Sequence, residues 1–86
     1  MRVATKNINI VKAEYIEGYV LKVYFSDSTF QVIDFTEQIT KLKGYYAKYK
    51  EIENFKAFKV EGGNLVWGKN WDLIFPNWQL YRGKIE

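Results

Sequence analysis

Three segments rich in β-branched and aromatic residues follow one another near the start of the chain, separated by short turns. They span residues 8–16, 19–25 and 30–35. In the middle segment Leu21, Val23 and Phe25 share one face, because side chains alternate along a strand. Glu17-Gly18 and the polar residues 26–29 supply the turns. This spacing predicts an antiparallel meander with the first segment at its edge.

The pattern changes after residue 35, where Lys, Glu and Gln become frequent. Ile39 and Leu42 are three residues apart and could cover the sheet from one side of a short helix. Asp34 precedes Glu37 by three residues, a loose capping-box pattern at the start of such a helix. Gly44 is expected to end it. The residues from 36 onward therefore predict a helical insert.

The rest of the chain contains β-type runs around a Gly-Gly turn. A second short helix is expected at 50–55, and the strands at 55–60 and 65–67 flank the turn. Pro76 is expected to begin a helical turn that folds back onto the sheet through Trp78, Leu80 and Tyr81. We therefore predict one α+β domain over 1–86: a small, mostly antiparallel β-sheet of about five strands, meander plus hairpin, with a short helical insert packed on one face.

The composition removes several chemistries, because the chain contains no cysteine and no histidine. Disulfides, thiolate nucleophiles and zinc–thiolate sites are excluded, as are the commonest general base and the commonest metal ligand. The serines near Asp27 have no base beside them, and the Gly-Gly turn lacks the lysine of a phosphate loop. The expectation is a protein that is not an enzyme and that uses no cofactor and no metal.

Neither a signal peptide nor a membrane span is visible. The first fifteen residues have no long apolar core and no small-residue cleavage pattern. No apolar run approaches the roughly 20 residues of a spanning helix. We therefore expect a cytoplasmic protein that does not bind membranes.

The order of short motifs resembles a small bacterial family catalogued as domain of unknown function 2442. The positions that carry the resemblance are Phe25, Asp27, Asp34, Phe55, Val60, Trp67, Asp72, Leu73, Pro76, Leu80 and Tyr81. The chain departs from the family pattern at Ser28, Phe35, Gly68 and Trp71. The family has no assigned function, but some relatives carry an added helix-turn-helix domain. Others look like members of toxin–antitoxin-like gene pairs, so the resemblance implies a regulatory role and a protein partner.

Residues 66–81 contain three tryptophans and one carboxylate, Asp72. This stretch could grip a ligand or could close a small core. An aspartate in a tight turn commonly accepts backbone N–H bonds two residues on, and large rings are costly to leave in water. The structural interpretation is favoured for Asp72, with Trp71 the ring expected to stay partly exposed and to mark a contact surface.

A second candidate surface lies in residues 41–50, where lysines and tyrosines alternate without an acid. Its members are Lys41, Lys43, Tyr45, Tyr46, Lys48, Tyr49 and Lys50. Basic charge with stacking rings suits single-stranded nucleic acid. The alternative is a helix pair whose tyrosines pack inward and whose lysines are solvated, and this alternative is favoured. The stretch is nevertheless the best functional surface in the sequence.

Together these observations favour a small interaction module that binds another protein. The expected surfaces are an exposed sheet edge, the 41–50 stretch and residues 71–78. A nucleic-acid-binding accessory protein that uses 41–50 remains the alternative, and an exposed edge would equally support a homodimer. Asp34 and Asp72 could form a carboxylate pair, but nothing in the sequence brings them together.

Overall fold

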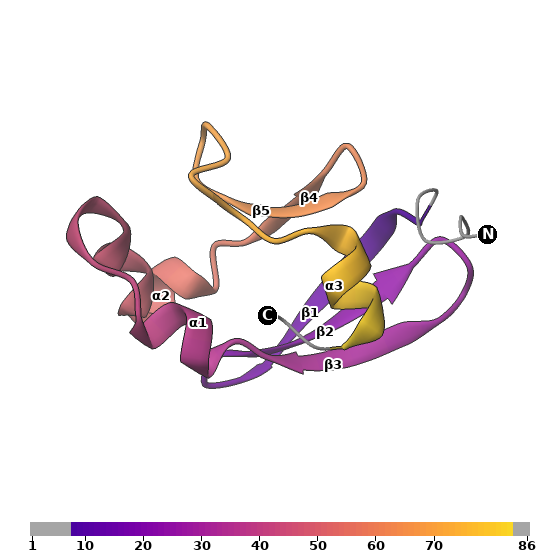
Figure 1. Cartoon of the computed structure of the whole chain (residues 1–86), viewed down its shortest axis with the longest axis horizontal. Coiled ribbons are helices and arrows are strands. Elements are labelled where there is room, and N and C mark those ends of the chain that lie inside the picture. Colours follow the sequence, from indigo (N-terminus) through magenta and orange to yellow (C-terminus); the bar gives the residue numbers. More distant parts are fainter. Residues whose placement is uncertain (1–7, 84–86) are drawn as a thin grey trace.

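The structure, a computed structural model, describes residues 8–83 and contains two three-stranded antiparallel sheets (Figure 1). The first sheet has the order β1-β2-β3, with β1 at Ile10–Glu17, β2 at Val20–Phe25 and β3 at Phe30–Asp34. The second has the order β4-β5-β6, with β4 at Lys59–Glu61, β5 at Asn64–Trp67 and β6 at Leu73–Ile74. The helical segments are α1 (Thr36–Thr40), the 3-10 helix η2 (Gly44–Lys50), α2 (Ile52–Phe55) and α3 (Asn77–Arg82). The α+β class is confirmed. Residues 1–7 and 84–86 of the expected domain lie outside the described residues.

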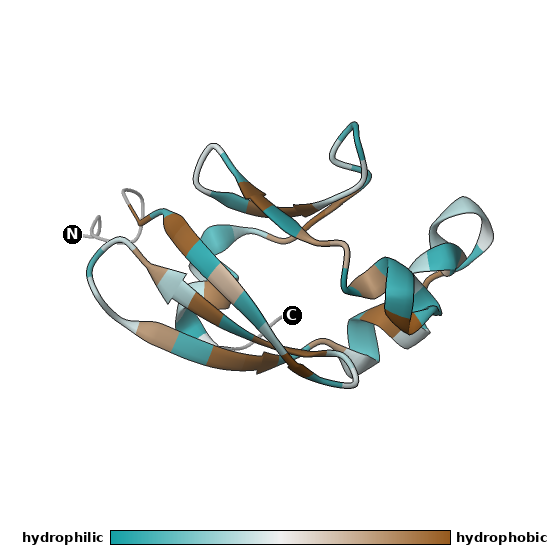
Figure 2. Ribbon diagram, turned by 180° about the vertical axis from the view of Figure 1, so that it is seen from behind, coloured by the Kyte–Doolittle hydropathy of each residue, from teal (hydrophilic) through white to brown (hydrophobic). Residues whose placement is uncertain are grey.

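The predicted meander is confirmed as the first sheet. Leu21, Val23 and Phe25 are buried on one face of β2, and Ile33 joins them from β3. Strand β1 is irregular, because its register with β2 shifts near each of its ends. Figure 2 shows the alternation of hydrophobic and hydrophilic residues along these strands. One face of the sheet therefore packs in the hydrophobic core.

The prediction of a single sheet is wrong, because the strands within residues 8–83, six in place of about five, form two sheets. The Gly62-Gly63 turn joins β4 to β5 as expected, but β4 begins only at Lys59, since Phe55 ends helix α2. Strand β6 was not predicted, and two residues give no readable period. The sheets are joined at one point by the Ile10 amide, which donates to the carbonyl of Gly63 at 2.9 Å.

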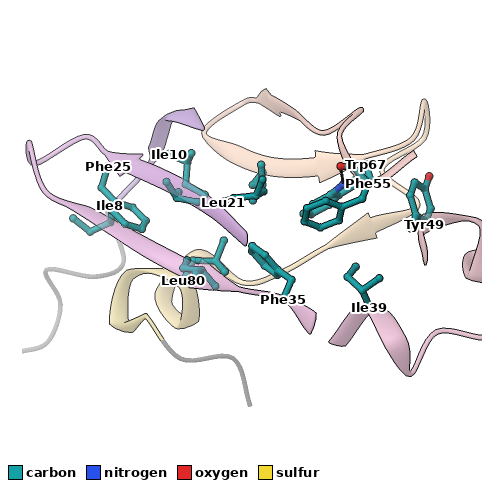
Figure 3. Packing of buried hydrophobic residues seen from close by; sticks show 13 residues of the cluster. Ile8, Ile10, Leu21, Phe25, Phe35, Ile39, Tyr49, Phe55, Trp67 and Leu80 are labelled. Carbon is teal, nitrogen blue, oxygen red and sulfur yellow. Dashed lines mark hydrogen bonds between the residues drawn. The ribbon is translucent and has the colours of Figure 1, made fainter. Parts of the chain in front are cut away.

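A cluster of aromatic rings around Trp67 fills the space between the sheets and the helical insert (Figure 3). The indole Nε1 of Trp67 donates to the carbonyl of Phe55 at 2.7 Å, and both residues are fully buried. The rings whose centroids lie within 6.5 Å of Trp67 are Phe35, Phe55, Phe58 and Phe75. Edge-to-face contacts of this kind add stability beyond buried area.

The helical insert differs from the prediction in its boundaries. Helix α1 ends at Thr40, and Gly44 begins the 3-10 helix η2 instead of ending α1. Asp34 Oδ1 accepts the Thr36 amide at 2.9 Å, so this carboxylate lies at the helix start but is not the N-cap that was expected. The capping box itself does not form, because the N-cap is Phe35 and makes no side-chain hydrogen bond. Ile39 is buried from α1, as expected for a helix that covers the sheet.

Helix α3 folds back onto the first sheet, as predicted from Pro76. Leu80 is fully buried, and the Tyr81 hydroxyl donates to Asp27 Oδ2 at 2.6 Å in the β2–β3 turn. The Gln31 side chain donates to the Tyr81 carbonyl at 3.0 Å. Trp78 does not pack inward, because its side chain lies beside Arg82 and stays 43% exposed. Leu80 and Tyr81 therefore attach this helix, and Trp78 does not.

Replacing Trp67 with alanine should remove about 3–5 kcal/mol of stability, because a large buried ring is lost and a cavity remains. A domain of this size has on the order of 5–15 kcal/mol in total. The matched control is Trp78→Ala, which removes the same residue type from the surface and should change stability by under about 1 kcal/mol. Urea unfolding followed by circular dichroism measures both. Equal losses in the two variants would contradict the assignment of Trp67 to the core.

The contact between Asp27 and Tyr81 predicts a dependence of stability on pH. Hydrogen bonds from Thr29 and then Tyr81 lower the pKa of the Asp27 carboxyl below its ordinary value. This contribution is present above the unfolded pKa, about 3.9, and is lost as the pH falls through the folded value. Tyr81→Phe should raise the Asp27 pKa in a carbon-detected NMR titration. Asp34, whose pKa is lowered by Thr36, is the internal control and should not move.

Candidate functional site

Asp72 gathers three side chains from the 41–50 stretch, and we call this group the Asp72 cluster. Its Oδ2 atom accepts from the Tyr45 hydroxyl at 2.9 Å and from the Tyr49 hydroxyl at 3.4 Å. Lys48 Nζ donates to the Tyr45 hydroxyl at 3.1 Å and lies 3.9 Å from Asp72 Oδ2. In a 3-10 helix residues three apart lie above one another, which puts Tyr45 and Lys48 on one side of η2. The cluster therefore fastens η2 to the turn between β5 and β6.

The turn that presents Asp72 depends on Gly68, which follows Trp67 directly. Its φ is +87°, a backbone conformation that residues with a side chain rarely adopt. A Cβ atom there would lie 2.6 Å from Asp72 Oδ2 and 2.8 Å from the Tyr49 hydroxyl. The turn closes through the Trp71 amide, which donates to the Gly68 carbonyl at 3.3 Å. Glycine is thus required for Asp72 to approach η2 this closely.

The partners of Asp72 support its structural role and correct the expected geometry. The sequence predicted backbone N–H donors two residues on, but the donors are hydroxyls 23 and 27 residues away. The Asp72 side chain is 17% exposed, and one of its oxygens is already satisfied by tyrosine hydroxyls and Lys48. This oxygen is therefore committed to holding η2 against the turn.

The environment of the cluster also shifts the pKa values of its members. Burial raises the pKa of the Tyr49 hydroxyl, and the neighbouring Asp72 charge acts in the same direction. The Tyr45 hydroxyl is the main cause of the raised pKa of Lys48. Both groups therefore stay protonated at neutral pH, which suits a cluster that holds two segments together.

The remaining candidate residues do not join this cluster. Lys41 pairs with Glu37 at 3.3 Å, and Lys43, Tyr46 and Lys50 are exposed. Of the three tyrosines expected to pack inward, Tyr49 alone is buried. Trp71 is 41% exposed as expected, with Nε1 donating to Glu61 at 2.6 Å. The expectation that a single tryptophan stays exposed was wrong, because Trp78 is exposed as well.

A second surface, the side of the first sheet that points away from the core, was not predicted from the sequence. We call it the outer face. Its residues are Lys12, Glu14, Lys22, Tyr24, Phe30 and Val32, which are paired across the strands as Lys12–Tyr24, Glu14–Lys22, Tyr24–Phe30 and Lys22–Val32. The even-numbered positions of the two strands include Lys22, Tyr24, Phe30 and Val32. This combination of aromatic rings, a valine and a lysine on one strand face is the sequence pattern that indicates the surface.

The outer face combines exposed apolar side chains with cations. Phe30 and Val32 are each 52% exposed. Lys22 Nζ lies 4.3 Å from the centroid of the Phe30 ring and 5.1 Å from that of Tyr24. The Tyr24 hydroxyl donates to Glu14 at 3.0 Å. A hydrogen bond from Lys12, and then that from Tyr24, lowers the pKa of the Glu14 carboxyl.

Strand β3 is also an edge of its sheet. The Phe25 amide donates to the Thr29 carbonyl, and the Phe35 amide donates to the Tyr19 carbonyl. Because bonded and non-bonded pairs alternate in an antiparallel ladder, the backbone groups of Phe30, Val32 and Asp34 point away from β2. Within residues 8–83 no strand pairs with that side of β3.

A hollow of about 590 Å³ lies beside this edge. It runs from β3 to the first turn of α1, and its lining residues are Val32, Ile33, Asp34, Thr36, Glu37, Gln38 and Gly83. The hollow leaves room for a chain along the outward backbone groups of β3.

Across residues 8–83 no group of three or more acidic side chains could hold a metal ion. Asp34 is bonded to Thr36, whereas Asp72 is bonded to Tyr45 and Tyr49, so the two carboxylates have separate partners. Over the same range, no helix has the length and apolar character needed to cross a bilayer.

No family model matches this chain, and neither a curated protein nor a solved structure matches it. The resemblance to domain of unknown function 2442 therefore stays a prediction.

Replacing Gly68 with alanine should cost more stability than the same change at Gly18. Both glycines have positive φ, but a Cβ atom at Gly18 meets nothing within 4 Å. Gly18→Ala should therefore cost only the backbone strain, about 1–2 kcal/mol. Gly68→Ala should cost about 1–3 kcal/mol beyond that, since the new methyl group collides with Asp72 and Tyr49. Urea unfolding measures the difference, and identical losses would show that the turn does not need the close approach.

Proposed function

We propose that this protein is a non-enzymatic interaction module that binds another protein by pairing β3 with a strand of that partner. The observation that carries the proposal is the combination, on one edge strand, of outward backbone groups and the exposed side chains of Phe30 and Val32. Strand addition at a sheet edge is a common mode of peptide recognition. Backbone hydrogen bonds supply affinity in this mode, and alternate side chains supply specificity.

The backbone of β3 supports the proposal because its free groups are regularly spaced. Phe30, Val32 and Asp34 each present an N–H and a C=O group away from β2. A five-residue edge strand is long enough to accept a short partner strand. The hollow beside Val32 and Asp34 provides the space that the added strand would fill.

The side chains of the outer face indicate what the partner strand contains. Apolar residues at alternate positions would cover Phe30 and Val32. Lys22 stands between them, and among residues 8–83 no carboxylate lies within ion-pair distance of its Nζ atom. Glu14 is already occupied by Lys12 at 3.0 Å. An acidic residue in the partner strand would therefore complement Lys22.

The net charge of the protein favours a different protein as the partner over a second copy of the chain. The protein carries a formal net charge of +3, so two copies would bring like charges together. The Asp72 cluster is a weaker docking candidate, because its hydroxyls and its carboxylate already satisfy one another. The absence of cysteine and histidine supports a binding role without catalysis.

Hydrogen exchange gives the first test, because the proposal predicts an alternating pattern along β3. In the free protein the amides of Phe30, Val32 and Asp34 should exchange quickly, while those of Gln31 and Ile33 should be protected. An apolar peptide with one central glutamate, selected from a display library against the protein, should slow the three fast amides. The same peptide with lysine in place of glutamate is the matched ligand control and should bind at least about tenfold more weakly.

A photo-crosslinking amino acid at position 32 gives the second part of the test, in cells that express the protein. Position 53, an exposed site on α2, is the matched control. One protein crosslinked from position 32 and not from position 53, and lost in Phe30→Asp, would support the proposal. A crosslinked homodimer would show that the strand added to β3 comes from a second copy of the chain, and not from another protein. Crosslinks to nucleic acid, or selected peptides that leave the β3 amides unchanged, would overturn the proposal.

A further inference from the structure

A smaller hollow of about 280 Å³ lies between η2, the end of α2, the start of β4 and the β5–β6 turn. We call it the basic hollow. Its lining residues are Lys48, Tyr49, Asn54, Ala57, Lys59, Gly68 and Lys69. Three of the seven are lysines, and none is an acid. The three lysines come from three separate segments, so only the fold brings them together.

The acids nearest to these lysines are already engaged. Asp72 receives Lys48 and the hydroxyls of Tyr45 and Tyr49. Glu61 lies 3.2 Å from Lys59 Nζ and accepts the Trp71 indole at 2.6 Å. Lys69 makes no ion pair within residues 8–83. Three lysines therefore have only two carboxylates, Asp72 and Glu61, near them, and the hollow carries a net positive charge.

Hydrogen bonds from side chains to backbone carbonyls fix the walls of the hollow without using its lysines. The Asn54 side chain donates to the Lys48 carbonyl at 2.8 Å and fixes the end of η2 against α2. The Tyr19 hydroxyl donates to the Lys50 carbonyl and ties η2 to the first sheet. At the opposite wall Gly68 lies against Asp72 Oδ2 and the Tyr49 hydroxyl, the two atoms that a Cβ atom at this position would meet at 2.6 and 2.8 Å. Lys48 and Lys59 each have one acidic partner, and because an ammonium group carries three donors, both retain a donor for a further ligand.

We propose that the basic hollow binds a phosphate group, whether free, in a nucleotide or in a nucleic-acid backbone. A lysine ammonium group binds phosphate as a point charge, and several such groups around one hollow suit a doubly charged oxyanion. The hollow lies at the lower end of the volume range of small-molecule sites, which fits a phosphate group better than a large apolar ligand. Tyr45, whose hydroxyl accepts from Lys48, and its neighbour Tyr46 are exposed on η2 and carry rings on which a base could stack.

This site is independent of the strand-pairing surface, because none of its lining residues belongs to the first sheet. It also differs from the Lys–Tyr surface predicted from residues 41–50. Lys41, Lys43 and Lys50 do not line it, whereas Lys59 and Lys69 come from other segments. Failure of one proposal therefore leaves the other intact.

The test is a nitrogen-detected NMR titration with inorganic phosphate, adenosine monophosphate and an eight-nucleotide oligothymidine at constant ionic strength. Saturable shifts are expected at residues 48–49, 59 and 68–69. Lys59→Gln and Lys69→Gln should each weaken binding of the tightest of the three ligands by about three- to tenfold, as expected for the loss of one charge-assisted contact. Lys41→Gln removes the same charge at the residue that follows α1, outside the hollow, and should leave the affinity unchanged.

The three ligands distinguish the source of the phosphate. Tighter binding of the oligonucleotide would identify a single-stranded backbone. In that case the slope of log K against log salt concentration should become smaller by about 0.7 for each lysine removed. Tighter binding of the mononucleotide or of inorganic phosphate would identify a small molecule. Shifts that do not saturate with any ligand, or an equal loss in Lys41→Gln, would show that net charge alone is responsible and would overturn the proposal.

Discussion

The structure depends on the contact between Trp67 and Phe55. Neither sheet buries its apolar side chains by itself, since Leu21 and Phe25 of the first sheet and Trp67 of the second lie in one shared core. The indole of Trp67 donates to the Phe55 carbonyl, and the two rings pack with Phe35 at the end of the first sheet. This cluster joins both sheets to the helical insert in a chain that has no cysteine for a disulfide.

The same contact positions the surface features on the insert side of the molecule. Gly68 follows Trp67, so the turn that carries Asp72 and Lys69 starts where the core ends. Asp72 then fastens η2, and η2 brings Lys48 toward Lys59. The basic hollow is thus a consequence of how the core and the turn are connected. The outer face, on the first sheet, owes its exposure to the absence of any covering element among the described residues.

The first sheet and the existence of a helical insert were predictable from the sequence, because both rest on local patterns. Alternation over β2 and the Gly62-Gly63 turn specify strands and a hairpin between neighbouring residues. Of the candidate site residues, the sequence identified Tyr45, Lys48, Tyr49 and Asp72, which the fold does bring together. It did not reveal Lys59 or Lys69 as their neighbours, since no period connects the three segments.

The sequence by itself determined the strands of the first sheet, the turn between β4 and β5 and the absence of cysteine and histidine, because each follows from residue types and short spacings. The tertiary structure decided which of three identical side chains is buried. Trp67 is enclosed by Phe35 and Phe55, while Trp71 and Trp78 stay partly in solvent. It also gave Asp72 partners 23 and 27 residues away. Burial and long-range hydrogen bonds depend on segments that meet only after folding, and a linear pattern does not encode that meeting.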